Sequence, residues 1–440
     1  MSLVDRLKGS GPNPEPRKSF QQDEETQKAF FQNTKFRIHQ KLVDRIDLDQ
    51  LARISAEDAR GQVAELVKKI LAEEKVALNA NLQRELIKEI VNETFGLGPL
   101  EPLLAKPNVD EILVNGPGQI YVEQHGQLSL TNITFKDANH LRHVINRIVA
   151  AVGRRIDEAS PMVDARLADG SRVNAIIQPL ALDGPILSIR KFKKIPLTDK
   201  DFISMGSMTD KVRDYLKMAV ESKLNILISG GTGTGKTTML NVVSRFIPPG
   251  ERILTIEDAA ELQLQQSHVV RLETRPANME GKGRIVQRDL VRNALRMRPD
   301  RIIVGEVRGE EALDMLQAMN TGHEGSLTTV HANTPRDAIS RIETMVLLGN
   351  SNLTHLAILR QIASALHLIV QIKRYRDGSR KVSSMSEIIG MENDIIVMQE
   401  IMKYEEKGID NQGKVIGSFV FQPVRPKFFS KVLTQYKEAA

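Results

Sequence analysis

A glycine-rich run between two apolar segments limits the folds open to this chain more than any other feature does. The run is Gly230–Thr238, with the sequence GGTGTGKTT, and it follows the strand-like segment Leu224–Ile228. A helix-like segment, Met239–Phe246, comes directly after it. A strand, a glycine turn and Lys-Thr at a helix start are the context of a phosphate-binding loop. A glycine turn that binds nothing is the alternative, and the agreement of both flanks with the motif argues against it.

The chemistry of such a loop assigns roles to its residues. Glycines let successive backbone N–H groups curve around a phosphate, and the positive end of the helix dipole lies beside them. Lys236 can reach the β- and γ-phosphates, and the Thr237 hydroxyl can ligate Mg²⁺. We therefore expect the chain to bind a nucleoside triphosphate with Mg²⁺. The expected nucleotide-binding residues of the loop are Gly231, Thr232, Gly233, Thr234, Gly235, Lys236, Thr237 and Thr238.

The composition is that of an ordinary globular protein long enough for two or three domains. The 440 residues include no cysteine, which excludes disulfides and cysteine-ligated zinc. Against 61 basic residues stand 55 acidic ones, an excess too small to indicate nucleic-acid binding. The first residues lack the apolar core of a signal peptide, and no stretch approaches the run of about 18 apolar residues that spans a bilayer. We expect a cytoplasmic protein without a transmembrane segment.

Changes in periodicity divide the chain into five parts. Residues 1–34 are rich in proline and charge, and we expect a disordered tail there. Apolar residues at helical spacing predict a helical bundle over 35–100, and short strands around one helix predict an α+β domain over 101–194. Residues 195–207 have little periodicity and are expected to form a linker. Over 208–440 strands alternate with helices, which predicts parallel βαβ units of the α/β class.

Two carboxylates follow strand-like segments of this last part. Glu257 follows residues 252–256, and Glu306 comes just after 301–304. Ligands bind at the carboxyl ends of parallel strands, so both side chains should face the triphosphate, although acids at strand ends can also be merely solvated. Gly305 stands where many P-loop ATPases place a Mg²⁺-ligating aspartate. We therefore expect Thr237, phosphate oxygens and water to hold the metal, with Glu257 or Glu306 ordering those waters and the choice of general base left open.

Histidines and arginines supply the remaining candidates. His331 ends a strand at the same expected sheet edge, so we favour contact with a γ-phosphate oxygen over a structural role for it. For His323 the two roles are equally compatible with the sequence. One set of arginines recurs every fourth residue and predicts one basic helix face, either solvated or reaching a neighbouring subunit's nucleotide. A second set could touch a triphosphate only if domains or subunits fold over it. The first set is Arg284, Arg288, Arg292 and Arg296, and the second is Arg166, Arg172 and Arg190.

Taken together, the motifs resemble those of the secretion ATPase superfamily of type II and type IV systems. Its members carry a Walker A loop, an acidic "Asp box", an atypical Walker B strand ending in Gly-Glu and a "His box", in this order. Among them the chain is most similar to the CpaF-type ATPases of tight-adherence (Tad/Flp) pilus systems. The resemblance covers about residues 60–400. The motifs that carry it are Gly230–Thr238, Thr255–Asp258, Met297–Gly309 and His323–His331, supported by Met162–Ala175 and Ala318–Ser326.

The resemblance implies a cytoplasmic homo-hexameric ATPase. Each subunit would pair a PAS-like domain with a RecA-like domain, and the ring would act on platform proteins at the inner membrane. Lys236 and Thr237 would bind phosphate and Mg²⁺, Glu306 would position the water, Glu257 would support the metal shell and His331 would sense the γ-phosphate. Arg166, Arg172 and Arg190 would reach the phosphates across a cleft or a subunit boundary, and Arg296 is a further candidate. Relatives with a four-cysteine zinc element fit less well, because this chain has no cysteine.

Two other functions remain as alternatives. RecA-like rings also translocate nucleic acid, but 4% aromatic residues and no tryptophan leave few platforms on which bases could stack. We therefore expect no direct contact with nucleic acid. A scaffold that binds ATP without hydrolysing it is the second alternative, and the presence of both Glu257 and Glu306 argues against it.

Overall fold

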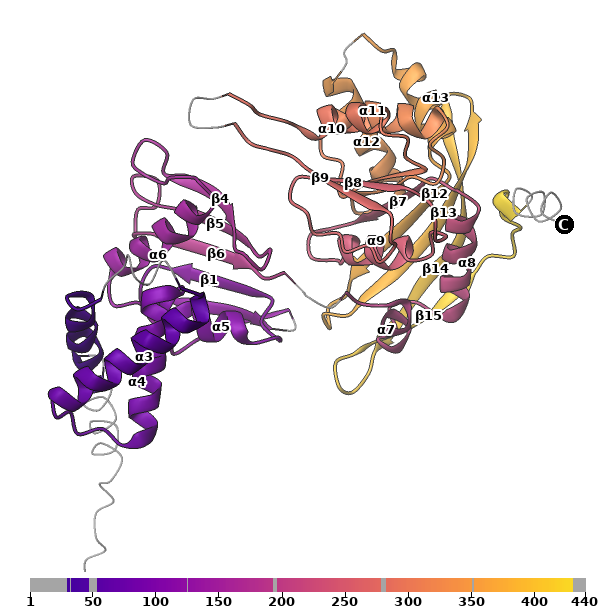
Figure 1. The fold of residues 1–440 in the computed structure, drawn as a ribbon. Coiled ribbons are helices and arrows are strands. Elements are labelled where there is room, and N and C mark those ends of the chain that lie inside the picture. The colour runs from indigo at the N-terminus through magenta and orange to yellow at the C-terminus, as the bar shows by residue number, and fades with distance from the viewer. Residues whose placement is uncertain are drawn as a thin grey trace, which may run out of the picture. The chain divides into compact units, whose positions relative to one another are not determined.

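Figure 1 shows the computed structural model of the chain. It describes residues 30–429, apart from 32, 47–53, 125, 193–195, 278–281 and 350–351. The tail expected over residues 1–34 therefore lies almost wholly outside the described residues. The chain divides into two compact units, Met1–Lys191 and Phe192–Ala440.

The first unit begins with a small group of helices. Residues 33–43 are helical, followed by α3 (Ala56–Glu73) and α4 (Ala80–Phe95). The Ser55 and Asn79 side chains cap the two longer helices by accepting backbone N–H groups of their first turns. Apolar residues at helical spacing meet in one core, as the sequence pattern predicts. That core contains Ile38, Leu42, Val63, Val67, Ile70, Leu71, Leu86, Ile87 and Ile90.

An antiparallel sheet of six strands forms the rest of this unit, in the order β3-β2-β1-β6-β5-β4. Helix α6 packs on it through Leu141, Val144, Ile145 and Ile148, and alternate strand residues complete the core. The mixed α+β character predicted for this region is confirmed. The elements are η2 (Gly98–Leu100), α5 (Glu101–Ala105), β1 (Glu111–Asn115), β2 (Ile120–Gln124), β3 (Gln127–Leu130), α6 (Ala138–Ala151), β4 (Met162–Arg166), β5 (Arg172–Ile176) and β6 (Ile186–Arg190).

The second unit is built on a nine-stranded sheet, in the order β15-β14-β13-β12-β7-β11-β10-β8-β9. The six strands from β12 to β9 are parallel, and β13, β14 and β15 extend the sheet as antiparallel hairpins. The strands are β7 (Ile226–Gly230), β8 (Ile253–Glu257), β9 (Val269–Glu273), β10 (Arg301–Val304), β11 (Leu327–His331), β12 (Leu368–Arg374), β13 (Arg380–Glu392), β14 (Ile395–Ile409) and β15 (Val415–Phe421).

Helices cover both faces of this sheet (Figure 1). Successive residues of β7 point to opposite sides, so Ile226 and Ile228 pack in one core and Leu227 packs in the other. Helices α8 and α9 contribute to the first core, and α10 to α13 contribute to the second. The fold is thus α/β and RecA-like, with the phosphate-loop strand in mid-sheet. The helices are α7 (Asp199–Ser204), α8 (Asp210–Glu221), α9 (Lys236–Ser244), α10 (Gln287–Ala294), α11 (Glu311–Asn320), α12 (Pro335–Gly349) and α13 (His355–Ala365).

The linker expected over residues 195–207 is in large part an ordered piece of the second unit. Thr198 and Asp201 form a capping box that starts α7, and Phe202 packs in the core. The expectation of a linker is wrong for residues 198–207, because a helix of six residues with a single buried side chain gives no detectable period. In the described part of the chain, no helix combines the length and apolar character needed to cross a bilayer.

Candidate active site

The glycine-rich run forms a tight loop between β7 and α9. Gly233 and Gly235 have φ of 68° and 93°, a region that favours glycine. A Cβ on Gly230 would lie 2.8 Å from the Ile372 carbonyl oxygen, so the neighbouring strand also requires glycine there. The Thr234 hydroxyl donates to the Gly231 carbonyl at 2.9 Å and braces the loop. The loop therefore has the backbone that a phosphate cradle needs.

The parallel sheet brings a carboxylate to this loop. Glu306 follows β10, and its Oε1 lies 3.7 Å from Nζ of Lys236. The same ammonium group donates to the Gly231 carbonyl at 3.3 Å. Arg308 holds the other carboxylate oxygen of Glu306 at 2.6 and 2.9 Å. A fixed carboxylate thus stands beside the lysine that the motif assigns to the terminal phosphates.

Glu257 lies at the end of β8 and is 3% exposed. Its Oε2 accepts the N–H groups of Glu261 and Leu262 at 2.8 and 3.0 Å, whereas Oε1 is buried without a hydrogen-bond partner. Burial raises the pKa of this carboxyl, although the two N–H donors oppose the shift. A buried carboxylate with one unused oxygen is suited to hold a water molecule or to take up a proton.

The side chain of Glu257 also explains the glycine at position 305. A Cβ on Gly305 would lie 2.8 Å from Cγ of Glu257, so an aspartate at 305 would displace Glu257 from its place. The backbone of Gly305 is fixed as well, because its N–H donates to Ile256 and its carbonyl accepts the Thr329 hydroxyl. The acidic group therefore comes from the neighbouring strand instead of from position 305.

His331 ends β11, where it is the register partner of Gly230 at the start of the phosphate loop. Burial and the nearby positive charge of Lys236 lower the pKa of this imidazole. The lowered pKa favours the neutral imidazole, which can donate one N–H without adding charge.

Thr237, Glu257 and Glu306 are the residues available to hold Mg²⁺. Among the described residues, no three His, Cys, Asp or Glu side chains form a ready metal site. The unused Oε1 of Glu257 and a threonine at the start of α9 fit a cation that takes its other ligands from phosphate and water.

The arginines recurring every fourth residue do not form one helix face. Helix α10 spans only Gln287–Ala294, so Arg284 precedes it and Arg296 follows it. Arg288 and Arg292 both bind the carboxylate of Asp314 on α11, at 2.9 and 2.7 Å. The prediction of one helix face with four arginines is wrong, because α10 is too short to include Arg284 and Arg296. Arg296 is exposed, and its contact with a nucleotide stays a prediction.

The second set of arginines forms a row across three strands of the first unit. Arg166 is the register partner of Arg172, which is the register partner of Arg190. Next in this row comes Glu111, 3.7 Å from Arg190. Their reach to a phosphate stays a prediction as well.

Two residues that the sequence reasoning missed contact the phosphate loop from its outer side. Arg380 donates from Nε to the Gly233 carbonyl at 2.8 Å, and Arg374 lies beside the same glycine. The sequence does carry a signal there, because five of the nine residues over 373–381 are basic and they directly follow the apolar run 368–372.

Comparison with known proteins gives one consistent family. The profile of the family described as "Type II/IV secretion system protein" matches residues 93–414. A Mycobacterium tuberculosis protein named for conjugal transfer is 38% identical over 306 residues, which are 68% of this chain and 86% of that protein. The type IV secretion system protein PtlH of Bordetella pertussis is 34% identical over 309 residues, covering 64% of this chain and 91% of its own length. Among solved structures, the VirB11 ATPase of the Brucella suis type IV secretion system is 27% identical. That match covers 67% of this chain and 97% of the other, with a TM-score of 0.37.

Proposed function

The chain belongs to the type II/IV secretion system protein family, and from that premise we propose that it is the motor of a tight-adherence (Tad/Flp) pilus or a closely related secretion machine. It is an enzyme that hydrolyses ATP. The finer proposal is a CpaF-type homo-hexamer in the cytoplasm that acts on an inner-membrane platform. It is supported by the separated motifs that follow one another in the order typical of such motors.

The observation that carries the enzymatic part is the 3.7 Å approach of Lys236 to Glu306 at the mouth of the phosphate loop. Lys236 and the loop N–H groups would bind the β- and γ-phosphates, and Glu306 would align the attacking water and accept its proton. His331 would donate to a γ-phosphate oxygen. Bound Mg²⁺ would neutralise phosphate charge, held by Thr237 and, directly or through water, by Glu257 or Glu306.

Two substitutions in the full chain test this assignment. In Lys236→Ala we expect loss of both nucleotide binding and phosphate release. In Glu306→Gln we expect binding to persist while phosphate release falls about 100-fold or more, because only the water-aligning charge is lost. Glu392→Gln, an exposed residue of β13, is the matched control and should leave both unchanged. Wild-type turnover in Glu306→Gln would contradict the role given to Glu306.

The ring and its cargo need separate measurements. Light scattering with a non-hydrolysable ATP analogue should give six copies, and a smaller stable assembly would contradict the ring. A strain lacking the gene should lose surface pili, and wild-type but not Glu306→Gln protein should restore them. Because some relatives are named for conjugal transfer, DNA is added to the hydrolysis assay. Strong salt-sensitive stimulation by DNA would favour a nucleic-acid motor instead.

A further inference from the structure

The turn between β12 and β13 touches the outer side of the phosphate loop. Strand β12 runs parallel to β7, and Ile372 is the register partner of Gly230. The chain then continues along the loop, reverses, and returns with Arg380 as the register partner of Arg374. The two arginines thus flank one turn, and both side chains lie beside glycines of the loop.

Arg380 makes the direct contact. Its Nε donates to the Gly233 carbonyl at 2.8 Å, and a Cβ on Gly235 would lie 3.6 Å from its Cδ. In a trans peptide the carbonyl and the following N–H point in opposite directions. Holding the Gly233 carbonyl on the outer side therefore directs the Thr234 N–H to the opposite side, where a phosphate would bind.

The turn itself is firmly anchored. Asp377 accepts the Val415 N–H at the start of β15 at 2.9 Å, and it also caps the turn through Ser379. Tyr375 is buried, with its ring 5.4 Å from that of Tyr404. Because the backbone that carries Arg380 is anchored in this way, the hydrogen bond from its side chain ties the loop to the turn.

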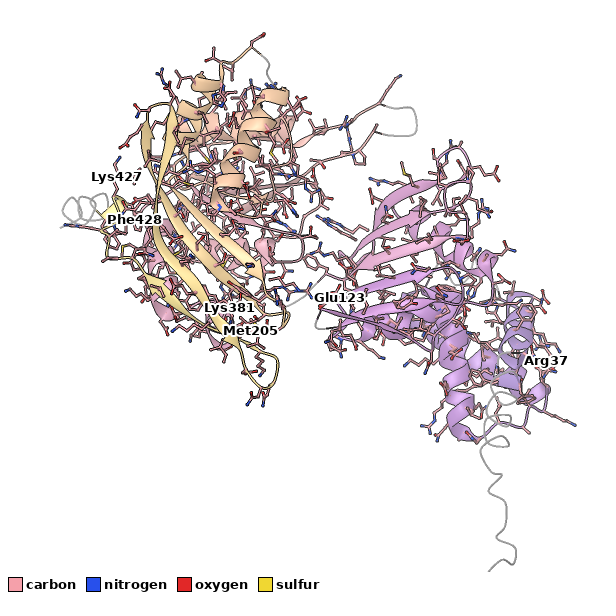
Figure 2. The ribbon with its side chains drawn as sticks, turned by 180° about the vertical axis from the view of Figure 1, so that it is seen from behind. Arg37, Glu123, Met205, Lys381, Lys427 and Phe428 are labelled. Carbon is pink, nitrogen blue, oxygen red and sulfur yellow. The ribbon has the colours of Figure 1, made fainter. Side chains whose placement is uncertain are left out.

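The residues after Arg380 lead to the beginning of the second unit. Lys381 donates from Nζ to the Gly206 carbonyl at 3.0 Å, and the Val382 N–H donates to Ser207 at 2.9 Å. Figure 2 shows Lys381 beside Met205, the residue that precedes Gly206 and Ser207. The segment follows α7, within the first 16 residues of the unit, counting from Phe192 to Ser207. The first three residues of β13 thus contact both the phosphate loop and residues 206–207, near the N-terminal end of the second unit.

We propose that Arg380 is a positioning residue for nucleotide binding, and that it couples occupancy of the phosphate loop to residues 206–207. The inference rests on the proposed function, since it requires that the loop bind a nucleotide. Arg380 orders the loop for the phosphates. A bound nucleotide orders the loop, and through Arg380 the ordered loop stabilises the start of β13. The two hydrogen bonds from Lys381 and Val382 to residues 206–207 are stabilised with it.

Full-length variants and a fluorescent ADP analogue test the first part. Arg380→Ala should weaken ADP binding about 5- to 10-fold, as expected for loss of one ordinary hydrogen bond. Arg380→Lys, which keeps a charged donor, should recover most of that affinity. Arg376→Ala is the matched control, because among described contacts Arg376 makes no hydrogen bond to the loop. The melting temperature without nucleotide should be the same in all variants, because Arg380 is exposed.

Hydrogen exchange tests the coupling. In the wild type, ADP should slow exchange of the Val382 amide, and in Arg380→Ala this effect should disappear. Arg380→Ala that binds ADP within twofold of the wild type, or that keeps the ADP effect on Val382, would overturn the inference alone. Failure of the wild type to bind ADP would instead overturn the proposed function, and this inference with it.

Discussion

Gly305→Ala adds a single carbon atom beside the buried carboxylate of Glu257. The new Cβ would lie 2.8 Å from Cγ of Glu257, closer than such atoms approach in folded proteins. Glu257 is 3% exposed and accepts two backbone N–H groups, so a retreat would break those bonds. Overpacking of this kind costs about 1–3 kcal/mol, and part of a charge-assisted hydrogen bond is lost with it. We expect a loss of about 2–3 kcal/mol, or about 5–10 °C in the melting temperature.

A double-mutant cycle with Glu257→Ala tests the cause. Without the Glu257 side chain the added carbon has space, so Gly305→Ala should then cost less than about 0.5 kcal/mol. Urea denaturation of the four proteins gives the stabilities, and phosphate release gives the rates. The single variant Gly305→Ala should also lose at least about tenfold in kcat, because the carboxylate is displaced. An equal cost of Gly305→Ala in both backgrounds would refute the reasoning.

Three further outcomes are expected. Burial raises the pKa of Glu257 above 4.5, so ionising this carboxyl destabilises the folded state relative to the unfolded one. In urea titrations the wild type should therefore lose stability relative to Glu257→Gln as pH rises from 4.5 to 7. A stability difference that does not change with pH would contradict this. Burial alone would raise the pKa of Glu93, but its hydrogen bond with His140 and the positive charge of Lys35 lower it to about 2. Glu93→Gln should therefore cost about 2–3 kcal/mol at pH 7 in thermal unfolding, and this loss should shrink as pH falls from 4.5 toward 2. A loss that stays constant with pH would argue against the ion pair. Arg301 is fully buried, and its Nε lies 2.5 Å from a carboxylate oxygen of Glu251. Arg301→Met should cost about 3 kcal/mol of folding stability, because it leaves the Glu251 carboxylate without its partner, and adding Glu251→Gln should recover part of that loss. No recovery in the double variant would show that packing alone explains the loss.

The sequence predicted best the strands that are buried on both faces. Residues 301–304 (RIIV) and 327–330 (LTTV) are short runs rich in β-branched residues, and they coincide with β10 and nearly with β11. Strand β9 was missed, because its residues are half exposed and two of the five are charged. Strands β13 and β14 extend over 13 and 15 residues with many polar side chains, so only fragments of that region gave a recognisable pattern. Long antiparallel strands with one solvated face carry a weak signal.

The parts of the site that follow directly after a recognisable strand could be predicted from the sequence. Lys236 and Glu306 each stand beside a strand that the pattern identifies, and the parallel sheet brings them together. The contact of Arg380 with Gly233 joins residues 147 positions apart, and no local pattern reports such a distance. The reason for glycine at 305 was equally hidden, since it depends on a side chain from the adjacent strand.

Gly230 has two register partners, His331 on β11 and Ile372 on β12. The first residue of the phosphate loop is therefore paired with a strand on each side and cannot slide along its own strand without breaking both ladders. Motion during a catalytic cycle must then arise beyond this residue, in the loop itself, or by movement of all three strands as one block. The end of β7 therefore fixes the positions of His331 and of the turn between β12 and β13 relative to the loop that carries Lys236.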